Sequence, residues 1–206
     1  MRIFNIFVLS IFTILLTACY TPPKIQVTQD LSGNYVLDPA HTSIVWKIKH
    51  AGLSNYTARF DTVSGILNFD PKNPQNSEVN ISIDPSSVNT GDADFDHTIG
   101  QGRQYFNAPQ YPHITFISTD ITITGGDNTG LIIGDLSFRG VTKQITLNVT
   151  FNGVGKSFGH KGKTLGFSAI TQFNRSDFGL SYRLNFGIND EITLFIETEF
   201  NENFNG

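Results

Sequence analysis

The stretch "HTSIVWKIKH", residues 41–50, alternates apolar and polar side chains with a period of two. Ile44, Trp46 and Ile48 share one face of an extended chain, and the two lysines share the other. Successive side chains of a β-strand point to opposite faces of a sheet. A shift of the strand by one residue would bury both lysines, so the apolar face is predicted to point into the core.

The same alternation recurs along most of the chain after Gly33, and it predicts a protein built mainly of strands. Strands are expected around residues 79–83, 145–151, 165–173 and 192–196, and further ones at about 57–70, 113–124 and 130–139. Turn-forming clusters such as "DPKNPQNS" and "TGGDNTG" separate them. About eight antiparallel strands with one apolar face each predict a closed barrel or a sandwich. Residues 94–107 lack the alternation and have room for one or two helical turns.

The beginning of the chain has the form of a secretory signal. A basic start precedes an almost wholly apolar run over residues 3–16, which is too short for a good membrane span. The next word, "LTAC", ends at the one cysteine and resembles the lipobox of bacterial lipoproteins, in which the cysteine receives a diacylglyceryl group. This resemblance predicts lipidation at Cys19, and Tyr20 in the next position resembles a signal for the outer membrane, facing the periplasm. An ordinary signal peptide with an accidental cysteine is the alternative.

The chain is therefore predicted to have three parts. Residues 1–18 are a lipoprotein signal peptide, residues 19–32 are a lipidated N-terminus with a flexible tether, and residues 33–202 are one folded domain. The exported part would have no free thiol to form a disulfide, so packing and backbone pairing must stabilise it. The net charge of −4 predicts no nucleic-acid partner. The composition does not indicate an oligomeric state.

An acidic cluster raises the question of a metal site. Asp92, Asp94 and Asp96 stand at the first, third and fifth positions of an EF-hand loop. His97 then replaces the required glycine, and Arg103 stands where the bidentate glutamate belongs. A zinc site would need three or four suitably spaced ligands, and the sequence contains neither an HExxH motif nor a cysteine pair. We therefore predict no metal, and a polar segment with Asp94 near a helix N-terminus.

The word "GKSFG", residues 155–159, fits the G-x-S-x-G pattern of hydrolases, with Ser157 as the nucleophile and His160 nearby. That motif requires a strand, a sharp turn and then a helix. Here lysines and glycines follow, and then a strand pattern, so a hairpin loop explains the word better. We predict no catalytic residue and no enzyme activity; a hydrolase that uses Ser157 is kept as a less favoured alternative.

Several words together resemble the YceI-like family of exported bacterial proteins. They are "YVLDPAHTSIVWKIKHAGLSNYTARFDTVSGILNFD", "ISIDPSSVNTGDADFDHTI", "YFNAPQYPHITFIST", "GDLSFRGVTKQITL" and "RSDFG", and they cover nearly the whole mature domain. The resemblance implies an all-β fold, an antiparallel eight-stranded lipocalin-like barrel that residues 92–112 cap at one end with a short helical segment. Residues 98–103 depart from the family's pattern, which usually has a leucine after the histidine and then a basic residue.

The resemblance also implies the function. Members bind polyisoprenoid or related long-chain lipids, so we predict a lipid-binding protein of the bacterial envelope with a bound isoprenoid or quinone-like lipid and no other cofactor. Each buried CH₂ of such a ligand gains about 0.8 kcal/mol. Plain core packing, in a structural or stress-related protein with a filled barrel and a protein partner, is the alternative. The candidate lining residues are Ile44, Trp46, Ile48, Leu67, Phe69, Val79, Ile81, Phe116, Leu136, Phe138, Phe167, Phe173 and Leu194.

Four basic residues are candidates for the lipid head group. They are His97, Arg103, Arg139 and Arg175, whose side chains can donate hydrogen bonds to a phosphate or quinone oxygen. Solvated residues at the rim of the barrel are the alternative for each. The predicted partners are a long-chain lipid ligand and, through the N-terminal anchor, a membrane.

Overall fold

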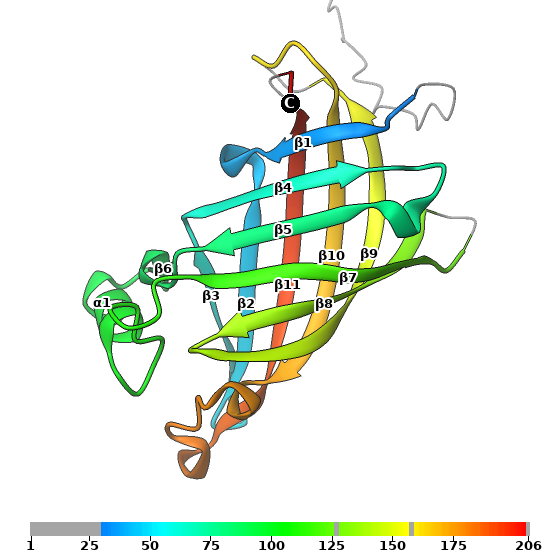
Figure 1. Cartoon of the computed structure of the whole chain (residues 1–206). Helices are drawn as coiled ribbons and strands as arrows, with labels where there is room; N and C mark the ends of the chain where they lie inside the picture. Colours follow the sequence, from blue (N-terminus) through cyan, green and yellow to red (C-terminus); the bar gives the residue numbers. More distant parts are fainter. Residues whose placement is uncertain (1–29, 126–127, 157–158, 205–206) are drawn as a thin grey trace, which may run out of the picture.

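The computed structural model describes residues 30–125, 128–156 and 159–204. These residues form one sheet of eleven strands, one α-helix and five short 3₁₀ turns (Figure 1). The strands are β1 (Gly33–Leu37), β2 (Ser43–His50), β3 (Ser54–Phe60), β4 (Val63–Phe69), β5 (Glu78–Ile83), β6 (Val88–Asn89), β7 (Ile114–Ile123), β8 (Thr129–Phe138), β9 (Val141–Gly155), β10 (Thr164–Asn174) and β11 (Ile188–Glu202). The helix is α1 (Ala93–Gln101), and the 3₁₀ turns are η1 (Pro39–His41), η2 (Pro74–Asn76), η3 (Pro85–Ser87), η4 (Arg175–Phe178) and η5 (Leu184–Phe186).

Eight of the strands close into an antiparallel barrel, as predicted. Their order is β1-β4-β5-β7-β8-β9-β10-β11, and β11 pairs back with β1, where Tyr35 lies opposite Glu202 and Leu37 lies opposite Phe200. The other three strands, β2, β3 and β6, extend from β11. Both β1 and β2 pair with the same strand, β1 with residues 200–202 and β2 with residues 188–197. The ring of strands is therefore closed at the C-terminal end of β11, where β1 pairs with it. Along the rest of β11, β2 and then β3 extend the sheet.

The prediction of one strand over residues 57–70 is wrong, because the chain bends after Phe60 and the two halves have different neighbouring strands. β3 ends at Phe60 and β4 begins at Val63, and the two strands do not pair with each other. Between them, Asp61 N donates to Ser87 O, and Asp84 N donates to Thr62 O. These hydrogen bonds give partners to the backbone groups of Asp61 and Thr62 at the end of β3. The alternation of side chains alone does not show that the strand ends there. β3 thus joins β2 and β6, whereas β4 joins β1 and β5.

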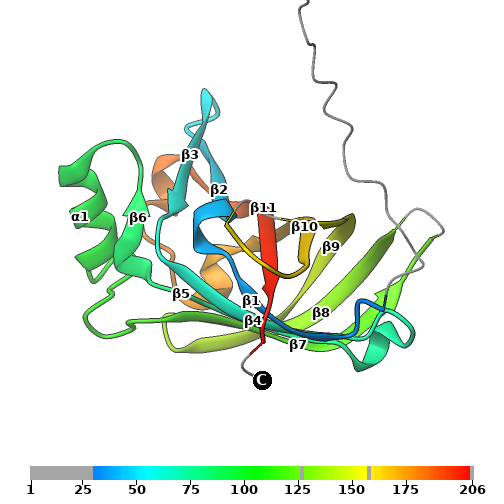
Figure 2. The same cartoon turned by 90° about the horizontal axis from the view of Figure 1, so that it is seen from above.

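The two walls of the barrel cross each other in the views of the whole chain. In Figure 1, β1, β4, β5 and β7 run across the picture, and β2, β10 and β11 run from top to bottom. The helix α1 lies at the side near β6 in both Figure 1 and Figure 2. The segment that contains η4 and η5, drawn in orange, lies at the end opposite to the C-terminus in Figure 1.

The core follows the alternation of the strands. Ile44, Trp46 and Ile48 are all buried, which confirms the direction predicted for that face. Leu31 is also buried, and its carbonyl oxygen accepts a hydrogen bond of 2.8 Å from the hydroxyl of the buried Tyr35. Desolvation raises the pKa of that hydroxyl to about 12. Packing therefore begins two residues before the domain boundary predicted at residue 33.

The helix α1 begins at the acidic cluster. Oδ1 of Asp92 accepts from the backbone N–H groups of Asp94 and Phe95 at 3.1 and 3.2 Å, and Oδ1 of Asp96 accepts from Thr90 N at 2.6 Å. A carboxylate at this place satisfies amides that have no partner in the helix and interacts favourably with the helix dipole. Asp92 thus caps the helix, Asp96 joins it to Thr90, and α1 packs against η3 and β6. Among the described residues, no helix has the length and apolar character needed to cross a membrane.

Candidate ligand-binding cavity

The barrel encloses a cavity of about 650 Å³ at the end covered by α1. Its wall combines aromatic and branched apolar side chains from β2, β3, β5, α1, β7, β8, β10 and β11 with the segments after α1 and after β10. Ligand pockets in proteins typically measure about 300–1,000 Å³ and have mostly apolar walls with a few polar groups. The volume and the lining are therefore those of a ligand site.

Four exposed side chains mark the opening of this cavity, which we call the mouth. They are His50, Tyr182, Arg183 and Phe186, and each belongs to the cavity wall. Tyr105 meets Tyr182 edge to face, with 5.1 Å between the ring centroids, and so joins the segment after α1 to the segment after β10. The basic side chains of the wall are His50, Arg175 and Arg183, and all its other side chains are aromatic or aliphatic.

A second cavity of about 120 Å³ lies inside the closed ring. Its wall comes from β1, β2, β4, β5 and β7–β11 and is almost wholly apolar. The two cavities have four wall residues in common, namely Ile44, Ile83, Leu136 and Leu194. The spaces are therefore neighbours, and a slender chain that entered at the mouth would meet the inner cavity beyond these four side chains.

The structure brings nearly all of the predicted lining residues to these two cavities. Every one of the thirteen except Phe69 belongs to the wall of one or both. The ring of Phe69 instead packs on those of Phe151 and Phe167, at centroid distances of 5.8 and 6.0 Å. That these residues contact a ligand stays a prediction.

Sequence reasoning missed the part of the wall that comes from outside the strands. Phe106 follows α1, and its ring lies 6.3 Å from that of Trp46, 5.6 Å from that of Phe60 and 5.5 Å from that of Phe138. Phe95 and Ile99 of α1 also line the cavity. They are four residues apart in the sequence, and this helical spacing could have indicated that they share one face. An irregular segment has no period that would reveal which of its side chains point inward.

Arg175 is the one head-group candidate in the cavity wall, and most of its guanidinium is already bound. The side chain is 4 % exposed, and burial lowers its pKa although the nearby Asp190 acts in the other direction. Four of its N–H groups donate at 2.8–2.9 Å to backbone carbonyl oxygens, those of Leu180, Tyr182, Ile188 and Asn189. A guanidinium has five N–H groups, so one remains. Arg175 thus holds the segment that borders the mouth, and its contact with a head group stays a prediction.

The other three head-group candidates lie outside the cavity wall. His97 and Arg103 are exposed on α1 and just after it. Arg139 and Gly140, both with positive φ, form the tight turn between β8 and β9, as type I′ hairpins require. Burial lowers the pKa of Arg139, and its Nη1 donates to Arg103 O at 3.2 Å. Arg103 and Arg139 are therefore neighbours, and none of the three candidates belongs to the wall at the mouth.

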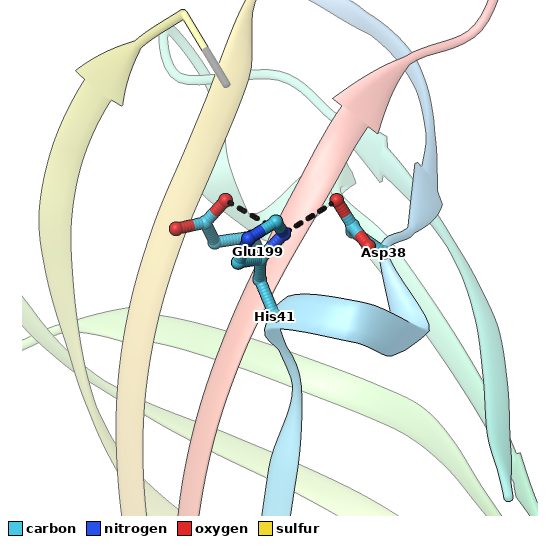
Figure 3. Close-up of side chains that lie close together, drawn as sticks. All are labelled: Asp38, His41 and Glu199. Atoms are coloured by element: carbon cyan, nitrogen blue, oxygen red, sulfur yellow. Dashed lines mark hydrogen bonds and ion pairs between the residues drawn. The ribbon is translucent and has the colours of Figure 1, made fainter. Parts of the chain in front are cut away.

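One group of three His, Asp and Glu side chains lies close enough together to hold a metal ion, as far as the described residues go. In Figure 3, His41 lies between Asp38 and Glu199, with its Nδ1 3.0 Å from Asp38 Oδ2 and 4.0 Å from Glu199 Oε2. The hydrogen bond to Asp38, together with both negative charges, raises the pKa of His41. Burial alone would raise the pKa of Asp38, but hydrogen bonds from His41, Ala40 and Asn201 lower it. His41 and the two carboxylates thus form an ion pair that holds η1 against β11.

Ser157 lies outside the described residues, so its surroundings are not defined. The next described element after β9 is the strand β10, where a nucleophile elbow would need a helix. His160 stacks on Phe204, with 5.9 Å between the ring centroids. The local order of elements thus agrees with a loop between two strands.

Residues 35–200, nearly the whole described barrel, match the model of the YceI-like domain. The chain belongs to the YceI-like family. A protein of Vibrio campbellii named UPF0312 is 37 % identical over 150 residues, which cover 71 % of this chain and 77 % of that protein. The resemblance found in the sequence words is thereby confirmed, and the family's barrel is the one described above.

Solved structures of YceI-like proteins share this fold. The Campylobacter jejuni YceI protein is 30 % identical and superposes with a TM-score of 0.66 over 73 % of this chain and 87 % of that one. A protein of Saccharophagus degradans, described as a polyisoprenoid binding domain, has a TM-score of 0.56 at 16 % identity and covers 82 % of this chain and 98 % of that one. The second likeness concerns the fold alone.

Proposed function

We propose that this YceI-like protein binds a long-chain isoprenoid, or a similar amphiphilic lipid such as a quinone-like one, inside its barrel. The observation that carries the proposal is the apolar cavity of about 650 Å³ that adjoins a second one of about 120 Å³. Protein interiors are normally packed as densely as organic crystals. An apolar space of this size, open at one end, therefore favours a bound ligand over a barrel filled by its own side chains.

The walls decide which part of the ligand lies where. The apolar interior suits a hydrocarbon chain, and each CH₂ removed from water contributes about 0.8 kcal/mol before the loss of chain and side-chain freedom is subtracted. The polar end belongs at the mouth, near His50 and Arg183. The Saccharophagus degradans domain, described as binding a polyisoprenoid, supports the view that this fold accommodates such chains. No step of this function requires a catalytic group.

Trp46 offers a direct test, because it is the only tryptophan of the chain and belongs to the cavity wall. Titrating delipidated protein with a long-chain isoprenoid should change the fluorescence of Trp46 saturably. A short-chain analogue should bind far more weakly, since each missing CH₂ forfeits about 0.8 kcal/mol. Equal responses to the long and short chains would indicate a surface site, and no response to either would favour a filled, structural barrel.

We also propose that the protein stores or carries this lipid in the bacterial envelope, anchored through Cys19 to the outer membrane and facing the periplasm. The support is the "LTAC" word, which lies outside the described residues. Two acyl chains give stable anchoring where one is marginal. Cells fed a labelled fatty acid should label the wild-type protein in the outer-membrane fraction and leave Cys19→Ser unlabelled. Label on the serine variant would contradict lipidation at this cysteine.

A further inference from the structure

Two loops place exposed apolar side chains beside the mouth. Leu53, in the turn between β2 and β3, is 87 % exposed, and Phe186, in η5, is 76 % exposed, the highest values among the large apolar side chains of the described residues. Ala51 N donates to Gly187 O at 2.7 Å and so joins the two loops. Figure 1 shows both at the end of the barrel opposite to the C-terminus. Exposed apolar side chains that gather in one place mark a site of interaction.

A cation accompanies these apolar side chains. The guanidinium of Arg183 lies over the ring of Tyr182, 5.1 Å from its centroid, and 6.0 Å from the centroid of Phe186. Arg183 has a φ of +60°, which is uncommon for a residue other than glycine. The Arg183 guanidinium thus lies near two aromatic rings. We call Leu53, Tyr182, Arg183 and Phe186 together the rim.

We propose that the rim docks on the surface of an anionic lipid bilayer. In the bound state, Leu53 and Phe186 enter the boundary between head groups and acyl chains, and Arg183 pairs with a lipid phosphate. Aromatic and basic residues are the groups that anchor proteins at this depth. This inference rests on the proposed function in one respect, since a cavity that takes up a membrane lipid must open toward the membrane that supplies it.

The form of the rim favours a bilayer over a protein partner. A stable protein interface buries about 800 Å² on each side. The rim instead consists of a few side chains on two neighbouring loops that surround an opening. A second copy of this chain would cover the mouth, whereas a bilayer gives the lipid a continuous apolar path from the acyl region into the cavity.

The test uses residues 30–206, which contain every strand of the sheet and lack the predicted signal peptide and Cys19. Co-sedimentation is measured with vesicles of phosphatidylethanolamine and phosphatidylglycerol, and with vesicles of phosphatidylcholine alone. We expect binding to the anionic vesicles and about a tenfold loss in Leu53→Ser and in Phe186→Ser, as the removal of one inserted side chain implies. Arg183→Gln should lower binding to the anionic vesicles and leave the weaker binding to phosphatidylcholine unchanged.

Matched controls come from exposed apolar residues elsewhere. Phe204 is 65 % exposed near the C-terminus, and Ile66 is 59 % exposed on β4. Phe204→Ser and Ile66→Ser should sediment with vesicles as the wild type does. Equal losses in these controls and in Leu53→Ser would overturn the proposal, and so would a wild type that binds neither kind of vesicle. Dimers that Leu53→Ser abolishes, without any vesicle binding, would assign the rim to a second copy and would also overturn it.

Leu53 separates this proposal from the proposed function, because it is exposed and does not belong to the cavity wall. Leu53→Ser should lose vesicle binding and keep the saturable Trp46 response to an isoprenoid added in solution. If the wild type binds vesicles through the rim but gives no Trp46 response, docking stands and lipid binding in the cavity fails. If Leu53→Ser retains wild-type vesicle binding, docking through the rim fails whatever the cavity binds.

Discussion

Replacing Arg175 by methionine is expected to destabilise the fold by about 3–5 kcal/mol. The four backbone carbonyl oxygens that now accept from its guanidinium would lose their donors. A buried acceptor left unpaired costs about 1–3 kcal/mol, and the net loss is smaller than four such terms because part of the segment can move toward water. Methionine fills much of the space of the side chain, so the loss reports mainly on the hydrogen bonds.

Urea unfolding of residues 30–206 measures this effect. Arg175→Lys should give an intermediate loss, because an ammonium cannot reproduce the planar fork that reaches carbonyls on two sides. Arg183→Met is the matched control, an exposed arginine of the same segment, and should leave the free energy of unfolding within about 0.5 kcal/mol of the wild type. A loss below about 1 kcal/mol in Arg175→Met would show that the buried guanidinium does not hold this segment.

The period of two predicted the strands well but did not determine how they pair. Alternation shows which face of a strand is buried, and it placed Ile44, Trp46 and Ile48 correctly. It contains no information about the neighbour of a strand, so the closure of the ring through a short pairing of β1 with β11 could not be derived from the residues. For the same reason, the break at Asp61 and Thr62 was missed, since it depends on hydrogen bonds to residues 84–87.

The candidate site divides in the same way. Side chains that line the cavities from the strands were predictable, because the inner face of a barrel strand is its apolar face. The contributions of Phe106 and Phe186 were not, since Phe106 lies in an irregular segment and Phe186 in a 3₁₀ turn of three residues, too short to show a period. The role of Arg175 also depends on the folded backbone, because carbonyl oxygens from residues 180–189 surround it only in three dimensions. The sequence segment "RSDFG" shows that position 175 is an arginine, but it does not show which groups the guanidinium binds.

Blocking the barrel at the junction of the two cavities should abolish lipid binding. Leu194 belongs to the walls of both cavities, so Leu194→Trp places a larger side chain where a ligand chain would pass. We expect affinity for a long-chain isoprenoid to fall at least about tenfold, which corresponds to the exclusion of two or more CH₂ groups from the barrel. Extra volume in a packed core destabilises by about 1–3 kcal/mol, but the existing space should reduce that effect here.

The neighbouring residue provides the matched control. Phe195 follows Leu194 on β11, points to the opposite face of the sheet and is exposed, with Lys47 Nζ 4.9 Å from its ring centroid. Phe195→Trp keeps an aromatic ring at that position and leaves the cavities unchanged. It should therefore bind isoprenoid as the wild type does. Urea unfolding of both variants, compared with the wild type, tests whether Leu194→Trp is still folded. If it is, a loss of binding in this variant comes from the blocked cavity.

The most direct measurement for lipid binding inside the barrel is the amount of lipid that solvent extracts from the purified protein, identified by mass spectrometry. The full chain, Leu194→Trp and Phe195→Trp are produced in bacteria, purified in parallel and extracted. We predict a stoichiometric amount of a long-chain isoprenoid or similar amphiphilic lipid from the wild type and from Phe195→Trp, and a strongly reduced amount from Leu194→Trp. Equal amounts from the wild type and Leu194→Trp, or a lipid-free wild type that takes up no added isoprenoid, would contradict a lipid site inside the barrel.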